Sequence, residues 1–199
     1  MIVNNIKIFL QNVHKNNLVI NTILKTQCKF NIIFIQKLSW SFIYSIPSSR
    51  NIEGEELVGV PNHPNWMTFS RNPSQGNDSS RFIIYINIWL CSLWFFLRND
   101  IFNHRDISCV SFFNHGSVYF LINVYSDSSQ MALKYLKNTK IDINNVLIIT
   151  GNFNIRDSSW DLNFPYHPQH SSDLFDIPDS LHLELSRPTK QIPTRYLDN

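Results

Sequence analysis

The chain has 199 residues, of which 43% are hydrophobic and only 16% are charged. This length suits one domain with a substantial core, and the low charge content excludes a chain that is disordered along most of its length. The three cysteines are odd in number and widely spaced, which excludes a secreted disulfide scaffold. A net charge of +2 gives no global sign of a nucleic-acid-binding surface. We expect a single intracellular domain over residues 1–199.

The longest apolar stretch, residues 83–97, contains Asn87 and Ser92. It is shorter than the roughly 20 apolar residues that a membrane-spanning helix needs. Its aromatic and β-branched residues favour two buried strands instead. The sequence therefore predicts no membrane segment.

Apolar runs rich in Ile, Val and Phe predict strands along the chain. Several are apolar at nearly every position, which is typical of strands covered on both faces. The sequence Asn114-His115-Gly116 predicts a tight hairpin turn. The predicted strands are Ile6–Gln11, Asn31–Gln36, Phe82–Ile88, Ile107–Asn114, Ser117–Tyr125 and Val146–Thr150, with weaker ones at Leu57–Val60 and Met67–Ser70.

Three segments with apolar residues at helical spacing predict helices: Asn16–Gln27, Ser129–Asn138 and Ser172–Leu185. Asp127 and the serines after it are predicted to cap the second helix. Pro178 is predicted to kink or restart the third. Helices on mostly antiparallel sheets predict an α+β fold, a layered sandwich of two mostly antiparallel sheets flanked by helices. No Gly-rich turn follows a strand, which argues against a doubly wound nucleotide-binding fold.

Polar residues follow the ends of four apolar strands. Any one of them alone would be expected where a strand meets water, but ligand sites of layered α/β proteins often form at such edges. Four in this order indicate a site. They are Asn12 after the first strand, Lys37 after the second, Asn123 and Tyr125 at the end of the fifth, and Gly151-Asn152-Phe153-Asn154 after the sixth.

The order of these motifs resembles the endonuclease/exonuclease/phosphatase superfamily, and within it the endonuclease domain of fungal non-LTR retrotransposons. The motifs that carry the resemblance are IFIQ with the later Ser39-Trp40, INVYSD, TGNFNIRDSSWD, and Pro193 to Tyr196. The resemblance implies a DNase I-like sandwich and Mg²⁺-dependent hydrolysis of DNA phosphodiesters. It also implies a reverse-transcriptase partner domain in the parent element and action in the nucleus.

The resemblance implies roles for five residues. Asn12 would help to position metal and phosphate, Tyr125 would hydrogen-bond the scissile phosphate, and Asn154 would stabilise the pentavalent phosphate. Lys37 stands where the family has a Mg²⁺-binding glutamate, in a Gln-Glu-Pro motif. Asn152 stands where the family has the aspartate that orients or deprotonates water, in a Gly-Asp-Phe-Asn motif.

The two replacements predict an impaired site. Mg²⁺ prefers carboxylate ligands, and an ammonium about 4 Å from a dication is repelled by roughly 8 kcal/mol at an effective dielectric constant near 20. Asn152 cannot accept a proton near neutral pH. We expect DNA nicking as in intact relatives to be impaired here, without bound Mg²⁺. The alternatives are a non-catalytic remnant with weak nucleic-acid binding and a phosphatase acting on a small phosphoester.

Two further family elements, an Asp and a late Asp-His pair, normally follow the Pro-Thr-Arg-Tyr region. We therefore expect the domain to be C-terminally incomplete, to lack its last strands and to leave an exposed sheet edge. Lys37 and Asn152 are each one G-to-A transition from the family residue, and Trp89 and Trp94 stand where the resemblance suggests Arg. A decayed element copy would explain all four replacements. Independent drift, or tryptophans packed in the core, is the alternative.

Overall fold

The computed structural model describes residues 6–38, 44–47, 55–71, 80–140, 143–155, 157–158, 169–181 and 183–184. Most of the strands form two four-stranded sheets, ordered β1-β2-β6-β5 and β10-β9-β8-β7. Each sheet has one parallel pair, β1 with β2 and β9 with β10, and its other pairs are antiparallel. The first sheet comprises Ile8–Asn12 (β1), Ile32–Gln36 (β2), Trp66–Phe69 (β5) and Phe82–Asn87 (β6). The second comprises Phe95–Leu97 (β7), Ile107–Asn114 (β8), Ser117–Tyr125 (β9) and Val146–Asn152 (β10).

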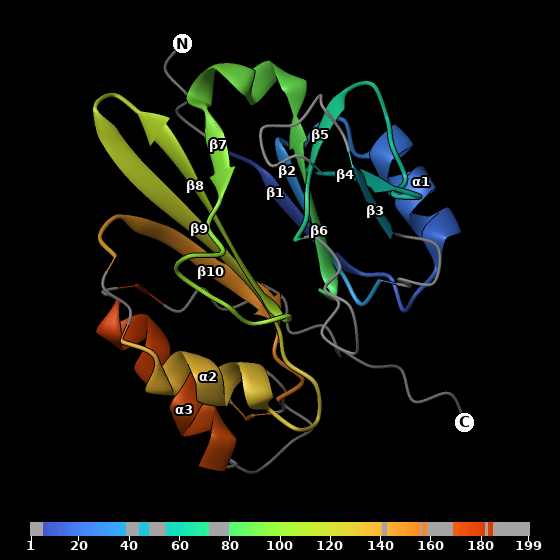
Figure 1. Ribbon diagram of the computed structural model, residues 1–199. Coiled ribbons are helices and arrows are strands. Elements are labelled where there is room, and N and C mark those ends of the chain that lie inside the picture. The colour runs from blue at the N-terminus through green and yellow to red at the C-terminus, as the bar shows by residue number, and fades with distance from the viewer. Residues whose placement is uncertain are drawn as a thin grey trace.

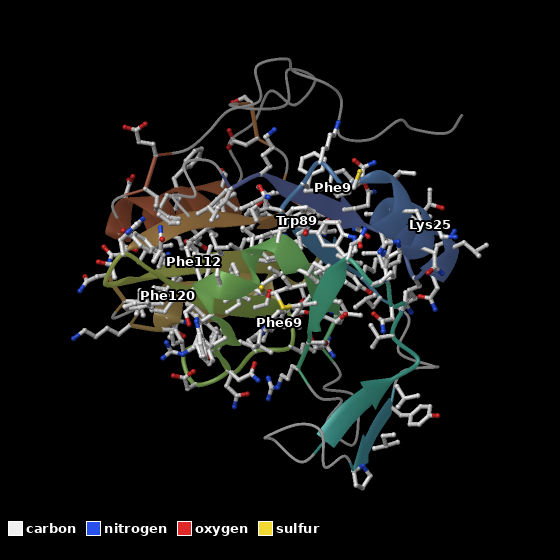
Figure 2. All side chains as sticks on the ribbon, turned by 90° about the horizontal axis from the view of Figure 1, so that it is seen from above. Phe9, Lys25, Phe69, Trp89, Phe112 and Phe120 are labelled. Atoms are coloured by element: carbon white, nitrogen blue, oxygen red, sulfur yellow. The ribbon has the colours of Figure 1, made fainter. Side chains whose placement is uncertain are left out.

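The helices cover the outer faces of the two sheets (Figure 1). Helix α1 (Asn17–Thr26) packs on the first sheet, and α2 (Met131–Asn138) and α3 (Gln169–Ser180) pack on the second. A small ribbon of β3 (Tyr44–Pro47) and β4 (Glu55–Val58) projects from the body of the protein (Figure 2). The predicted α+β layered sandwich is confirmed.

The continuous apolar run of β2 follows from its place in the middle of this sandwich. Successive side chains of a strand point to opposite faces. Ile33 and Ile35 pack against α1, whereas Ile32 and Phe34 face the second sheet. All four side chains are fully buried. A strand covered on both faces has no polar side, which is why its sequence does not alternate.

The segment from residue 83 to residue 97 is not simply two strands. Strand β6 is followed by a 3-10 helix, η2 (Ile88–Leu93), whose first turn is capped by the Asn87 side chain accepting from the Trp89 N–H at 3.1 Å. Trp89 is 75% exposed and Trp94 is 69% exposed, so the alternative that these tryptophans pack in the core is wrong. Among the described residues, no helix is long and apolar enough to cross a membrane.

The predicted hairpin turn and the predicted ends of α1 are found, whereas α3 ends at Ser180 instead of the predicted Leu185. Asn16 caps α1 by accepting from the Leu18 and Val19 N–H groups. His115 and Gly116 both have positive φ, as a two-residue hairpin turn requires. The predicted cap of α2 is wrong, because the residue at that position is Gln130, in the left-handed region and with no side-chain cap.

Cys109 on β8 predicts a loss of stability in alkali. The thiol is 1% exposed among the apolar side chains beneath α2 and α3, and burial raises its pKa to about 12. The pKa of Cys109 in the folded protein lies above its value in the unfolded chain. The stability that the buried, neutral thiol contributes is therefore fully present below about pH 8.5 and is lost as pH rises toward the folded pKa. We expect Cys109 to contribute a loss of about 1.4 kcal/mol per pH unit in that window.

Urea unfolding at several values between pH 8 and pH 11 measures this loss. Cys109→Ala should unfold with a shallower pH dependence, whereas Cys28→Ala, which removes an exposed thiol, should keep the slope of the unmodified chain. Equal slopes in the unmodified chain and Cys109→Ala would contradict the prediction.

Candidate functional site

The five predicted site residues lie at or just after the ends of four strands. Asn12 ends β1 and is paired with Gln36, which ends β2. Tyr125 ends β9 and is paired with Asn152, which ends β10. Strands β1 and β10 are the outer strands of their sheets and contact each other across the sandwich. We call the group Asn12, Lys37, Tyr125, Asn152 and Asn154 the strand-end site.

A buried glutamine joins the two halves of this site. Gln36 Nε2 donates to Asn123 Oδ1 at 2.6 Å and to the Val124 carbonyl at 2.9 Å. Gln36 and Asn123 are both fully buried. The end of β2 is therefore tied to the end of β9, so that residues of the first sheet and of the second face the same end of the sandwich.

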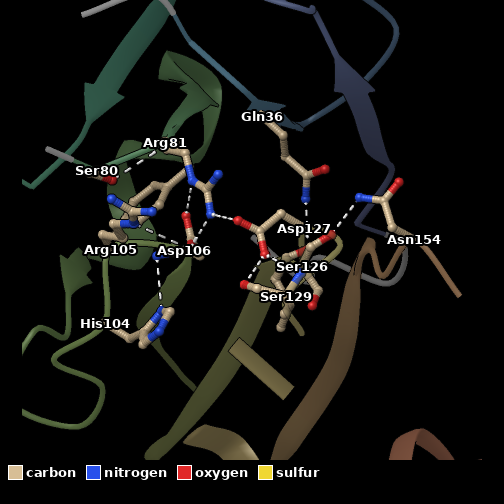
Figure 3. A network of polar contacts seen from close by, with 12 residues as sticks. Gln36, Ser80, Arg81, His104, Arg105, Asp106, Ser126, Asp127, Ser129 and Asn154 are labelled. Carbon is tan, nitrogen blue, oxygen red and sulfur yellow. Dashed lines mark hydrogen bonds and ion pairs between the residues drawn. The ribbon is translucent and has the colours of Figure 1, made fainter. Parts of the chain in front are cut away.

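The loop after β10 is fixed against the end of β9. The Asn152 side-chain oxygen accepts from the Asn154 N–H at 3.1 Å, and its carbonyl accepts from the Ser126 N–H at 2.8 Å. Asn154 has a left-handed φ of 50°, and its side-chain nitrogen donates to the Ser126 carbonyl (Figure 3). Asn154 also hydrogen-bonds the Tyr125 side chain. These contacts hold Tyr125, Asn152 and Asn154 together.

Lys37 is held through its backbone. Its N–H donates to the Arg81 carbonyl at 2.8 Å, and its carbonyl accepts from the Lys15 N–H at 2.7 Å. The residue has a left-handed φ of 57° and is half-buried. Its ammonium forms no ion pair with any described residue. A cation is therefore placed at the end of β2 without a neutralising partner in the described part of the chain.

Next to the strand-end site lies an ion-pair cluster that the sequence analysis missed. Arg81, directly before β6, binds both carboxylate oxygens of Asp106, and its Nη2 lies 3.0 Å from Asp127 Oδ2 (Figure 3). The Asp106 side chain is only 3% exposed. The guanidinium carbon of Arg81 lies 4.7 Å from the centre of the Tyr125 ring, within the range of a cation–π contact. One arginine thus joins both carboxylates to Tyr125.

The direction of the strands explains how this cluster was missed. Strands β6 and β8 run antiparallel to β2 and β9. Their first residues therefore come to the edge where β2 and β9 end, and this places Arg81 and Asp106 beside Tyr125. The predicted site residues all follow a strand or end one, whereas Arg81 and Asp106 precede one. The signal that could have revealed the cluster was a charged residue directly before each of two apolar runs.

Burial and neighbouring charge set the protonation of the cluster. Burial raises the pKa of Tyr125, while the Arg81 charge acts in the opposite direction. The phenol is therefore protonated at neutral pH and can donate a hydrogen bond. A hydrogen bond from the Ser129 hydroxyl, together with Arg81, lowers the pKa of Asp127, so this carboxylate is ionised at neutral pH.

The side chains at the strand-end site do not fit Mg²⁺. This ion prefers hard oxygen ligands that include one or two carboxylates. The oxygens offered here belong to asparagine amides and a phenol, and Lys37 adds an ammonium. The nearby carboxylates of Asp106 and Asp127 are both bound to Arg81. In the part of the chain that the structure describes, no three His, Cys, Asp or Glu side chains are grouped to hold a metal ion.

Comparison with known proteins identifies the fold. The sequence matches no family model and has no match among curated proteins. Among solved structures, the endonuclease domain of TRAS1, a telomere-specific non-LTR retrotransposon, has a TM-score of 0.67 and 14% identity, covering 96% of this chain and 76% of that one.

Two other solved structures are similar over much of their length. A humanized D. rerio TDP2 has a TM-score of 0.41 and 12% identity, covering 82% of this chain and 68% of that one. A mutant of beta toxin from Staphylococcus aureus with bound magnesium ions has a TM-score of 0.43 and 10% identity, covering 89% of this chain and 70% of that one. The TRAS1 likeness and the two mixed sheets flanked by helices give the conclusion: the chain has the layered fold of the DNase I-like nuclease domains.

Proposed function

We propose that this chain is an endonuclease-type domain, derived from a non-LTR retrotransposon of the fungal type, that recognises DNA phosphodiesters and is impaired in hydrolysing them. One observation carries the proposal. Asn12, Tyr125 and Asn154 lie at one end of a DNase I-like sandwich, and the sequence resemblance assigns Lys37 and Asn152 to the positions of the family carboxylates.

The retained groups suit phosphate binding. Tyr125 is a protonated phenol, and the Asn12 and Asn154 side chains supply amide donors. Lys37 adds a positive charge that attracts a phosphodiester. The same set lacks a base for water, because Asn152 cannot take up a proton near neutral pH. General acid–base catalysis typically contributes about 10²- to 10⁴-fold to a rate, so hydrolysis should fall by at least that range.

A second candidate is a non-catalytic remnant that binds nucleic acid weakly. It is favoured by the binding of Asp106 and Asp127 to Arg81, which contacts the Tyr125 ring, because both carboxylates are thereby occupied. The exposure of Trp89 and Trp94 supports decay from a parent element, since arginine is mostly found at exposed positions. In the parent element the partner would be a reverse-transcriptase domain, and the place of action the nucleus.

Nicking of supercoiled plasmid in Mg²⁺ tests the impairment. We expect the unmodified chain to nick at background rate while it still retards duplex DNA in EDTA. Lys37→Glu should acquire measurable Mg²⁺ affinity by calorimetry, because it restores a carboxylate and removes the ammonium. It should not gain rate, because position 152 still lacks a base.

Lys25→Glu is the matched control, since it makes the same charge change at an exposed position on α1. It should leave both Mg²⁺ affinity and nicking unchanged. Robust Mg²⁺-dependent nicking by the unmodified chain would overturn the proposed impairment. If Lys37→Glu gains no Mg²⁺ affinity and the unmodified chain binds duplex DNA only weakly, the non-catalytic remnant is favoured.

A further inference from the structure

An apolar patch lies on the outer face of the second sheet, next to β7. Trp94, Phe96 and Phe113 are each at least half exposed, and Val118 is 40% exposed. All four line one hollow of about 690 Å³. Phe113 and Val118 are paired across β8 and β9. Phe96 is paired with Ser111, two residues before Phe113, so these side chains lie on one face of the sheet. We call Trp94, Phe96, Phe113 and Val118 the β7 patch.

The patch is exposed because the helices cover only part of this face. Helices α2 and α3 pack on Cys109, Phe120 and Ile122, which lie farther from the turn between β8 and β9 than the patch does. The four side chains of the patch expose on the order of 400 Å² of apolar surface. A contiguous apolar patch of this size on a folded chain is often a site of contact with another molecule.

The charges beside the patch favour a second copy of this chain as its partner. The charged residues that line the hollow are Arg98 and Asp100. Their side chains bond each other at 2.8 and 2.6 Å, so the pair is neutral. A nucleic-acid backbone binds to surfaces with excess positive charge, and a strongly charged protein partner needs a surface of the opposite sign. A neutral patch attracts neither, whereas two copies of it meet without repulsion between like charges.

Strand β7 also offers free backbone groups along its outer edge. It runs from Phe95 to Leu97 and is the last strand of its sheet, beyond β8 (Figure 1). In an antiparallel ladder, alternate residues turn their N–H and C=O groups toward the neighbouring strand. The Arg98 N–H donates to the Cys109 carbonyl at 2.8 Å. The backbone of Phe96 therefore also faces β8, whereas the backbone groups of Phe95 and Leu97 face outward. In the described part of the chain, these outward groups form no hydrogen bond.

We propose that the β7 patch binds a second copy of this chain, with the two β7 strands paired antiparallel about a two-fold axis. The axis passes beside Phe96, so Phe95 of each copy is opposite Leu97 of the other. These pairs exchange backbone hydrogen bonds, because they consist of the outward-facing residues. The two Phe96 side chains meet directly, in a pair whose Cα atoms lie about 4.5 Å apart. No residue of the strand-end site takes part, so the dimer is independent of the proposed function.

The size of the patch suits a closed dimer. A stable interface buries about 800 Å² on each partner, of which roughly 65% is apolar in homodimers. The exposed apolar surface of the patch, on the order of 400 Å², supplies most of that apolar share. Two-fold pairing occupies the β7 edge of both copies, so assembly stops at the dimer.

Sedimentation equilibrium of the full chain over micromolar concentrations tests this proposal. We expect a monomer–dimer equilibrium for the unmodified chain. Phe96→Asp and Phe96→Lys each place a charge opposite its own copy across the two-fold axis, and like charges directly opposite repel. Each should raise the dimer dissociation constant at least tenfold. Trp89→Ser is the matched control. It removes an exposed aromatic side chain on η2 that does not line the hollow, and it should dimerise as the unmodified chain does.

Mixing the two charged variants separates this geometry from general damage. An equimolar mixture of Phe96→Asp and Phe96→Lys should regain the dimer, because opposite charges then face each other. Misfolded variants would not recover on mixing. The proposal is overturned if the unmodified chain stays monomeric, if it assembles beyond the dimer, or if Phe96→Asp dimerises normally. It is also overturned if the mixture stays monomeric, because the two Phe96 positions would then not face each other.

Discussion

Replacing Gly151 with alanine should destabilise the protein by about 3 kcal/mol, at the upper end of the usual cost of overpacking a core. Gly151 pairs with Val124 in the parallel ladder between β10 and β9. A Cβ atom at Gly151 would lie 1.9 Å from the Val124 carbonyl oxygen and 2.8 Å from its carbonyl carbon. Both are backbone atoms of an inner strand, so no side chain can move aside, and β10 must shift away from β9.

The shift would also reach the strand-end site. Asn152 follows Gly151 directly, and the Ser126 N–H bonds its carbonyl. Gly151→Ala should therefore weaken the proposed DNA binding as well as lower the urea midpoint. Gly116→Ala is the matched control. It adds the same methyl group where nothing lies within 4 Å, and its positive φ should cost only about 1–2 kcal/mol. Equal midpoints for the two variants would refute the close approach at Gly151.

The fold was predictable because its strands are short apolar runs with clear ends. The central strands β2, β6, β8 and β9 lie within a residue of the predicted bounds, since a strand buried on both faces is apolar at nearly every position. The segment after β6 was not predictable in the same way. Its apolar residues suited either a strand or a helix, and η2 leaves Trp89 exposed because a 3-10 turn presents side chains on three sides.

The site was predictable only in part, because the sequence shows where strands end but not which side chains meet between the two sheets. Polar residues after a strand are visible in the sequence, and this gave Asn12, Lys37, Tyr125, Asn152 and Asn154. Which side chains meet across the sandwich depends on the pairing of the two sheets, which a single sequence does not reveal. Asp127 illustrates the point. Its position before α2 predicted a helix cap, whereas its carboxylate binds Arg81 and the Ser129 hydroxyl.

Replacing Arg81 with methionine should cost about 3 kcal/mol of stability, because removing one partner of a buried ion pair leaves the other charge poorly compensated. The ion-pair partner that remains, Arg105, lies 3.6 Å from Asp106. The charge left is that of Asp106, whose side chain is 3% exposed. Methionine keeps much of the apolar stem of arginine, so lost packing contributes little. Arg98→Met is the matched control. It breaks a pair with the exposed Asp100, and exposed pairs contribute less than about 1 kcal/mol.

A second substitution shows whether Arg81→Met destabilises the protein because it leaves the Asp106 charge poorly compensated or because it disrupts the packing. Arg81→Met combined with Asp106→Asn removes both buried charges and should regain most of the lost stability in urea unfolding. If the double variant is no more stable than Arg81→Met, the cost does not come from the poorly compensated carboxylate.

The pH dependence of stability in acid gives an independent measure of how Arg81 stabilises the protein. The folded pKa of Asp127 is lowered by the Ser129 hydroxyl and by Arg81. Its contribution to stability is therefore present above the unfolded pKa, near 3.9, and is lost as pH falls through the folded value. Below about pH 4, protonation of Asp127 should therefore reduce the difference in free energy of unfolding between the unmodified chain and Arg81→Met. A gap that stays constant from pH 7 to pH 3 would show that Arg81 does not act on stability through Asp127.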